Sequence, residues 1–171
     1  MASAIHMKAR VKCGIPGADK KEEELNNNTN TLDEEKLKAE EEQLVKQGEE
    51  ALFMKGVSYK NNKDYDNAIK YFNLARENGT NPKYISQSLY QLGLCFEQLN
   101  KDDEAIEHYQ GYVNGYNTSY DYYDDAYYKI AILHYNNNRL EEAKDALYSL
   151  RYEDPNSAYN STEEVKNILR Q

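Results

Sequence analysis

The sequence predicts an all-α fold of three antiparallel helix pairs that is closed by a C-terminal helix. Residues 49–160 contain the same helix-pair pattern three times, and Asn-rich turns divide each pair into a first helix (A) and a second helix (B). A small residue in helix A stands twelve positions before an alanine in helix B in every copy. Because unrelated helices have no reason to keep this spacing, the pattern indicates a helical repeat.

The small residues mark where the two helices of a pair are expected to cross. The three pairs of a small residue and its alanine are Gly56 with Ala68, Gly93 with Ala105, and Ala131 with Ala143. A small side chain on each helix lets the backbones approach, and large residues such as Tyr59 and Phe72 fill the space around the crossing. The small residues of helix A recur after 37 and then 38 positions, which predicts three stacked units of similar shape.

Capping residues give the ends of the predicted helices. The expected N-caps of the B helices are Asp64, Asp102 and Asn138. Asn81 and Pro82 begin the second A helix, Ser119 begins the third, and Ser161 with Glu164 opens the last helix. These signals predict helices over about residues 49–61, 64–78, 83–98, 102–115, 120–136, 139–151 and 162–170.

The N-terminal part is predicted to be separate from the repeats. Met1–Met7 has the look of a tag remnant, and residues 1–30 are expected to form a tag and a disordered polar tail, because a charge run and an Asn-rich stretch cannot bury apolar surface. Residues 31–48 are expected to form a charged helix that begins at Thr31 with a capping box. A signal or membrane anchor upstream of Met1 stays open.

The three copies resemble tetratricopeptide repeats over residues 49–171, through Gly56 and Tyr59 with Ala68 and Phe72 and their counterparts. The resemblance implies a right-handed α–α superhelix of three helix pairs with a C-terminal capping helix. It also implies a scaffold that binds a protein or peptide. The long repeats and final helix are similar, more loosely, to the C-terminal domain of the Tol–Pal coordinator (YbgF/CpoB-like) family. This resemblance implies a cell-envelope complex, so it favours the bacterial cell envelope over the cytoplasm as the location.

In such repeats the A helices line a concave groove, and the resemblance assigns the groove residues of this chain. The residue after each core residue is rotated by about 100° about the helix axis. At these positions each A helix carries an aromatic and an aliphatic residue, and the third A helix also carries Tyr135. The predicted partner-binding residues are Phe53, Val57, Tyr90, Leu94, Tyr128, Ile132 and Tyr135. The amides Asn61, Gln98 and Asn136 follow them. Lys60 is the one cation on these stripes, which is too few for a clamp on a terminal carboxylate.

Three occupants of this groove are compatible with the sequence. The first is an extended or helical peptide of another protein, because exposed aromatic rows usually mark interaction sites. The second is the protein's own N-terminal helix, through the stripe Leu37, Leu44 and Val45, or the same helix of a neighbouring copy in a homo-oligomer. The third is additional core, without any ligand.

Composition argues against other functions. The formal net charge of −9 is unsuited to neutralising phosphates, so no nucleic-acid partner is expected. The positions of the two cysteines and three histidines form no nucleophile–base pair and no metal-ligand spacing, and the chain has no glycine-rich phosphate loop, so no enzyme activity, small-molecule substrate, cofactor or metal is expected. Cys95 and His134 are interpreted as packed core residues, and His108 as exposed.

Overall fold

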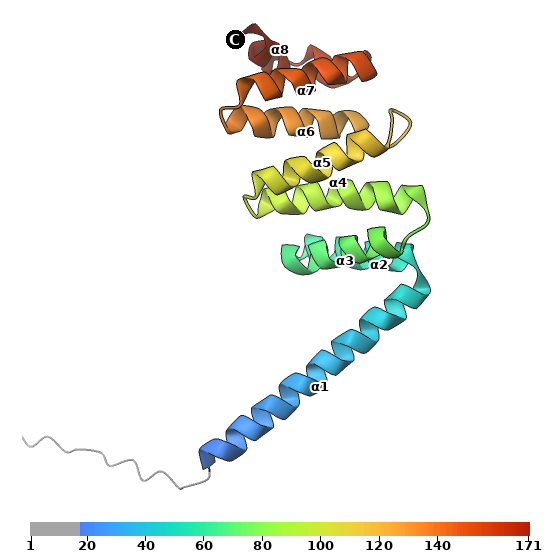
Figure 1. The fold of residues 1–171 in the computed structure, drawn as a ribbon, viewed down its shortest axis with the longest axis vertical. Helices are drawn as coiled ribbons and strands as arrows, with labels where there is room; N and C mark the ends of the chain where they lie inside the picture. Colours follow the sequence, from blue (N-terminus) through green and yellow to red (C-terminus); the bar gives the residue numbers. More distant parts are fainter. Residues whose placement is uncertain (1–17) are drawn as a thin grey trace, which may run out of the picture. The chain divides into compact units, whose positions relative to one another are not determined.

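The computed structural model describes the backbone of residues 18–171 and the side chains of residues 33–171, and the regular elements in this part of the chain are all helices (Figure 1). The contacts divide the chain between Glu42 and Gln43 into two units. No helix within residues 18–171 is both long enough and apolar enough to cross a membrane.

Helix α1 (Ala18–Gln47) corrects the predicted N-terminal organisation. The polar stretch before Thr31 was expected to be disordered, but from Ala18 onward it is part of the helix. The segment contains no glycine or proline, and its many Glu, Lys, Leu and Gln residues favour helix, so nothing ends the helix locally. It ends at Gly48, whose φ of 100° lies in the left-handed region. The predicted tail over residues 1–17 lies outside the described residues.

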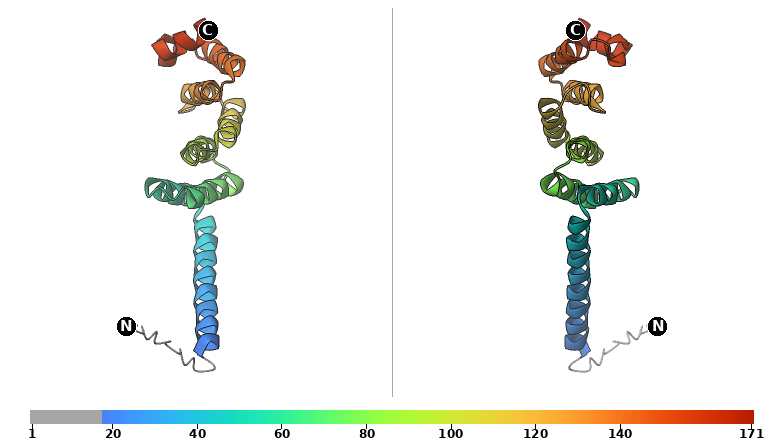
Figure 2. Two further views of the ribbon diagram at one scale, coloured as in Figure 1. Left: turned by 90° about the vertical axis from the view of Figure 1, so that its left-hand side faces the viewer. Right: turned by 90° about the vertical axis from the view of Figure 1, so that its right-hand side faces the viewer.

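The unit Gln43–Gln171 contains three helix pairs, in which α2, α4 and α6 are the A helices and α3, α5 and α7 the B helices. Their bounds are α2 Glu49–Asn61, α3 Tyr65–Asn78, α4 Pro82–Gln98, α5 Asp102–Gly115, α6 Tyr123–Asn136 and α7 Leu140–Glu153. Each helix packs on the next along the chain, and from α4 to α7 the A and B helices alternate from side to side (Figure 2). The predicted all-α repeat fold is confirmed.

The turn from helix A to helix B has one geometry in all three pairs. A residue in the left-handed region ends each A helix, and the next residue donates its N–H to the carbonyl five positions back, which satisfies a free carbonyl of the helix end. The left-handed residues are Lys63, Asn100 and Asn138. The hydrogen bonds, with N···O distances of 2.9–3.0 Å, run from the N–H of Asp64 to the carbonyl of Tyr59, from Lys101 to Phe96 and from Arg139 to His134.

This turn explains which predicted caps are correct. The Asp64 side chain accepts from the N–H of Asn67 and caps α3 as expected. Asp102 is instead the first residue of α5, and Asn138 is the left-handed residue of its turn, so neither is an N-cap. Asn81 caps α4, and Pro82 is its first residue, as predicted.

Helix α6 begins at Tyr123 and not near Tyr120 as predicted from Ser119. Tyr122 precedes it with a φ of 70° in the left-handed region, so the helix cannot extend backward through it. The Tyr112 hydroxyl donates to the carbonyl oxygen of Asp121, which holds this connection against α5.

The crossing points lie where the small residues predict. A Cβ added at Gly56 would meet the Phe72 ring at 2.7 Å, and one added at Gly93 would meet the Tyr109 ring at 2.4 Å. Only glycine therefore fits between these helices. Leu92, beside the second crossing, is fully buried, and Cys95 is buried as well.

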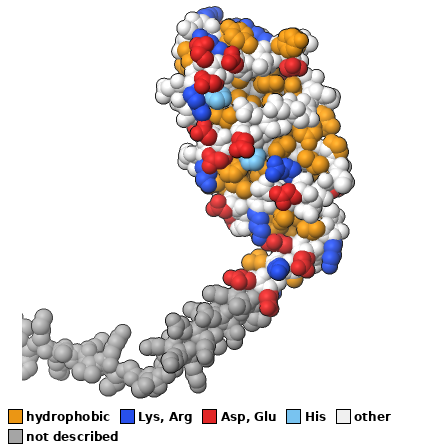
Figure 3. All heavy atoms as spheres, viewed as in Figure 1, with side chains coloured by type: hydrophobic (Ala, Val, Ile, Leu, Met, Phe, Trp, Pro, Cys, Tyr) orange, Lys and Arg blue, Asp and Glu red, His pale blue; other side chains and the backbone are white. Residues whose placement is uncertain are grey.

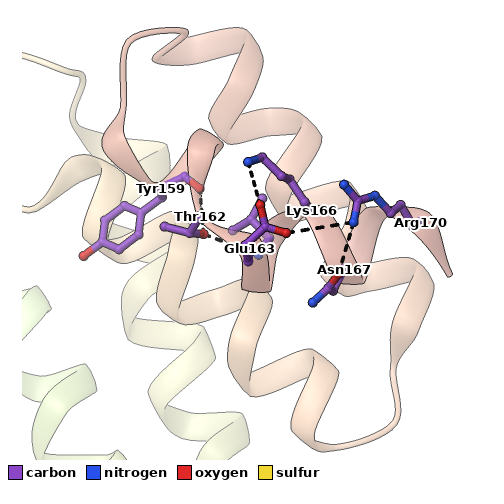
Figure 4. Close-up of polar contacts among 7 residues, drawn as sticks. Tyr159, Thr162, Glu163, Lys166, Asn167 and Arg170 are labelled. Carbon is purple, nitrogen blue, oxygen red and sulfur yellow. Dashed lines mark hydrogen bonds and ion pairs between the residues drawn. The ribbon is translucent and has the colours of Figure 1, made fainter.

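A 3-10 turn (Ala158–Ser161) and helix α8 (Glu163–Arg170) follow α7. The Thr162 hydroxyl accepts from the N–H of Val165, so the cap lies one residue after the predicted Ser161. Figure 4 shows this start, with Lys166 bound to Glu163 one turn further along. Val165 and Ile168 are buried in the core beneath, which is what the end of a repeat stack requires.

Candidate functional site

The aromatic residues predicted to line an open groove instead form joints between successive repeats. The ring of each A helix meets a ring from the start of the next repeat or of the C-terminal segment. We name these three contacts the aromatic ladder: Phe53 with Tyr84 at 5.8 Å between ring centroids, Tyr90 with Tyr122 at 4.4 Å, and Tyr128 with Tyr159 at 4.2 Å.

The ladder corrects the expected exposure of Phe53 and Tyr90. These side chains are only 9% and 7% exposed. Phe53 also contacts Phe72 of its own pair, and Tyr90 contacts Tyr109 of its own pair. A sequence pattern gives the side of the helix on which a ring lies, but it does not show that the next repeat supplies a second ring to cover it.

The C-terminal segment covers Tyr128 and Tyr135 in part. The Tyr128 hydroxyl donates to Glu164 of α8, and Gln171 donates to the Tyr135 hydroxyl at 2.9 Å. The Tyr159 hydroxyl donates to Asp125 at the start of α6. Tyr128 and Tyr135, the two residues predicted from the sequence, are half-buried. Burial, and then the hydrogen bond to Glu164, raise the pKa of Tyr128 to about 12, so this phenol stays a proton donor at neutral pH.

The rings that complete the ladder were missed by sequence reasoning. Tyr84, Tyr122 and Tyr159 recur after 38 and 37 positions, close to the period of the repeat. That recurrence was a usable signal, because residues that keep the repeat spacing occupy matching places in the stack.

The aliphatic residues of the predicted site remain partly accessible. Val57, Leu94 and Ile132 are half-buried, one on each A helix, and the amide residue four positions later is exposed in every case. These amides are Asn61, Gln98 and Asn136. We call these six positions the A-helix row.

Polar contacts join neighbouring A helices beside this row. The Lys60 ammonium donates to the Gln91 side chain, and Lys129 forms an ion pair with Glu97 at 2.8 Å. A hollow of about 240 Å³ opens between the first two A helices, lined by Lys60, Tyr65, Leu94 and Gln98. Because Lys60 and Lys129 already have partners, neither is held ready for a terminal carboxylate.

The buried cysteine and the two histidines of the repeats have the properties of packed side chains. Burial raises the pKa of the Cys95 thiol to about 11, so it is protonated and unreactive at neutral pH. Burial also lowers the pKa of His134 and of His108. His134 is buried, as predicted, whereas His108 is half-buried against Phe96 and not exposed as predicted. Among the described residues no group of three or more His, Cys, Asp or Glu side chains could hold a metal ion.

The stacked helix pairs and their shared crossing geometry define a helical-repeat protein. Family models described as tetratricopeptide repeat match residues 49–75, 87–119 and 125–157. The chain therefore contains tetratricopeptide repeats, one in each helix pair.

Two solved structures share the fold. The first tetratricopeptide domain of Spaghetti (RPAP3), solved with an HSP90 peptide, is 22% identical, with a TM-score of 0.57 over 72% of this chain and 92% of that chain. The Yersinia enterocolitica type III secretion chaperone SycD, solved with a peptide of the translocator YopD, is 19% identical, with a TM-score of 0.55 over 71% of this chain and 88% of that one. No curated protein matches the sequence.

Proposed function

We propose that this protein is an interaction scaffold that binds an extended peptide segment of a partner along the A-helix row. The observation that carries the proposal is the repetition of one accessible aliphatic residue followed by one exposed amide on every A helix. An amide side chain both donates and accepts, so it can pair with a peptide backbone, while the aliphatic residue contacts alternate side chains. The two related folds were both solved with bound peptides, which supports this mode.

The peptide chemistry follows from the charges beside the row. With Lys60 and Lys129 engaged by Gln91 and Glu97, the surface offers amides and aliphatic groups, so the partner segment is apolar and internal to its chain. The aromatic ladder has a structural role in this proposal. Of the residues predicted from the sequence, Val57, Leu94, Ile132 and Tyr135 keep the binding role.

Selection from a displayed library of random peptides, with the full chain as bait, tests the proposal. The double variant Gln98→Ala/Asn136→Ala removes two exposed amides, and Asn156→Ala is the matched control in the loop after α7. We expect the double variant to bind selected peptides about tenfold more weakly, since each hydrogen bond contributes about 0.5–1.5 kcal/mol. Thermal melting should be unchanged in both proteins. Equal binding by wild type and double variant would contradict the proposal.

The alternative, a groove filled by the protein's own or a neighbour's N-terminal helix, is an outcome of the same experiment. Leu44 already packs against the core beside the first helix pair, whereas Leu37 is 50% exposed. A synthetic peptide of residues 31–47 that competes with the selected peptides would favour self-occupation. Dimers in sedimentation would then indicate a neighbour's helix in the groove, and monomers the protein's own helix. The cell-envelope setting implied by the looser resemblance stays a prediction, which fractionation of the source cells tests.

A further inference from the structure

The third repeat lacks a ring that the first two repeats have on the outer side of the stack. In the first pair Tyr71 of α3 stacks on Tyr59 of α2, with centroids 5.3 Å apart and planes inclined by 15°. In the second pair His108 of α5 stacks on Phe96 of α4 at 5.0 Å and 13°. Tyr71 and His108 are 37 positions apart, and the next matching position, 38 further on, is Ala146.

A cavity opens where that ring is missing. It has a volume of about 510 Å³ and lies between the B helices α5 and α7, with α6 at its base. Its least exposed lining residues are Val113, Ile130, His134 and Ala146, which are all less than 10% exposed. His134 matches Tyr59 and Phe96 in the repeat, so it is the ring that has no stacking partner from its B helix. We call this cavity the outer groove.

The rim of the outer groove is acidic. Glu142 and Asp145 of α7 line it and are exposed, and no Lys or Arg is among its lining residues. Figure 3 shows histidine side chains in pale blue beside acidic side chains in red on this face of the molecule. The groove therefore has an aromatic ring at its bottom and two carboxylates at its rim. This arrangement suits a planar cation.

In the second repeat a cation of the protein itself lies near the matching ring, His108. Arg76 of α3 lies close enough to His108 to lower the pKa of that imidazole, and Glu107 acts on it in the opposite direction. Thirty-seven positions after Arg76 the chain has Val113. The groove of the second repeat thus has the His108 ring and, near it, the Arg76 guanidinium of the first repeat. The groove of the third repeat has Ala146 and Val113 at the two matching positions.

We propose that the outer groove of the third repeat is a second docking site, which takes an arginine side chain of a partner protein. The guanidinium plane lies over His134 in the space above Ala146, and its N–H groups bind Glu142 and Asp145. Arginine fits better than lysine because it is planar and forms paired hydrogen bonds with carboxylates. Burial, and then the nearby Arg139, lower the pKa of His134, so its imidazole is neutral at pH 7 and does not repel the cation. Arg139 does not line the groove and forms an ion pair with Asp103 at 2.7 Å. This site is separate from the A-helix row.

Nuclear magnetic resonance titration with small probes tests the site directly. N-acetyl-arginine methylamide should shift the ring signals of His134 saturably, and the lysine analogue should bind about threefold more weakly. Glu142→Gln/Asp145→Asn should abolish the difference between the probes. The matched control, Glu104→Gln/Glu107→Gln, removes the equivalent carboxylates from the filled groove and should leave the His134 response unchanged.

A second variant separates occupation of the groove from loss of folding. Ala146→His restores the ring that His108 provides in the second repeat, and it should block the arginine probe while the melting temperature stays the same or rises. Equal shifts from both probes, or binding retained in Ala146→His, would overturn the proposal. So would stronger binding of p-cresol, since the groove would then take an uncharged ring. Gln98→Ala/Asn136→Ala should not affect the arginine probe, so failure of the proposed peptide row is distinguishable from failure of the outer groove.

Discussion

Tyr128 stacks on Tyr159 with ring centroids 4.2 Å apart and planes inclined by 12°. The contact joins the last A helix to the C-terminal segment, and Tyr90 makes the equivalent contact with Tyr122 one repeat earlier. In a repeat protein each unit contacts only its neighbours, so stability depends on these interfaces. The ladder therefore couples the stability of one repeat to that of the next.

Tyr159→Ala should destabilise the C-terminal end of the stack by roughly 2 kcal/mol, since it removes a stacked ring and the hydrogen bond to Asp125. Urea unfolding followed by circular dichroism measures the effect. Tyr152→Ala is the control because Tyr152 is 83% exposed, and it should change stability by less than about 0.5 kcal/mol. Equal midpoints for the two variants would show that the ladder contributes nothing.

Two glycines in helices should respond to alanine in opposite directions. A Cβ at Gly93 would lie 2.4 Å from the Tyr109 ring, whereas a Cβ at Gly111 would meet only Leu89, at 3.7 Å. Gly93→Ala should therefore cost about 1–3 kcal/mol through overpacking. Gly111→Ala should stabilise the protein by about 0.5–1 kcal/mol, because alanine loses less entropy in a helix. Thermal melts of both variants decide the matter, and a stabilised Gly93→Ala would mean that the two helices have more room at their crossing than this distance allows.

The fold was largely predictable because its determinants are local and repeated. Gly56, Gly93 and Ala131 each stand twelve positions before an alanine. Gly56 and Gly93 lie directly against rings of their B helices, and Ala131 is fully buried. Asn81 with Pro82 gave the start of α4 correctly because a cap acts within one turn. The predicted start of α6 was wrong because it is set by packing against α5. The left-handed conformation of Tyr122 and the hydrogen bond from Tyr112 to Asp121 both depend on that packing.

The candidate site was less predictable because exposure depends on partners distant in sequence. Tyr90 lies one step round from the core stripe, which indicates a helix side but not what covers it. Its cover is Tyr122, 32 positions later, in a connection without regular structure. The outer groove was missed for the same reason, since the absence of a ring at Ala146 matters only beside His134 of another helix.

The tyrosines of the ladder should make the protein unstable at high pH. Burial, followed by the hydrogen bond to Glu164, raises the pKa of Tyr128 to about 12, and burial raises that of Tyr90 and Tyr159 as well. An unfolded chain ionises its tyrosines near pH 10. Above about pH 10 the unfolded state has therefore lost protons that the folded state keeps, so the free energy of unfolding falls as pH rises toward about 12.

Urea unfolding at a series of pH values between about 9 and 12 measures this slope, and tyrosinate absorbance near 295 nm reports the ionisation itself. Tyr128→Phe should show a shallower decline than wild type, because it removes one phenol whose pKa differs between the two states. Glu164→Gln keeps the ring and its burial but removes the carboxylate that accepts the Tyr128 proton donor. Its slope should fall between those of wild type and Tyr128→Phe. If Tyr128→Phe and wild type decline equally, Tyr128 titrates alike in both states, and the contact with Glu164 does not hold its proton.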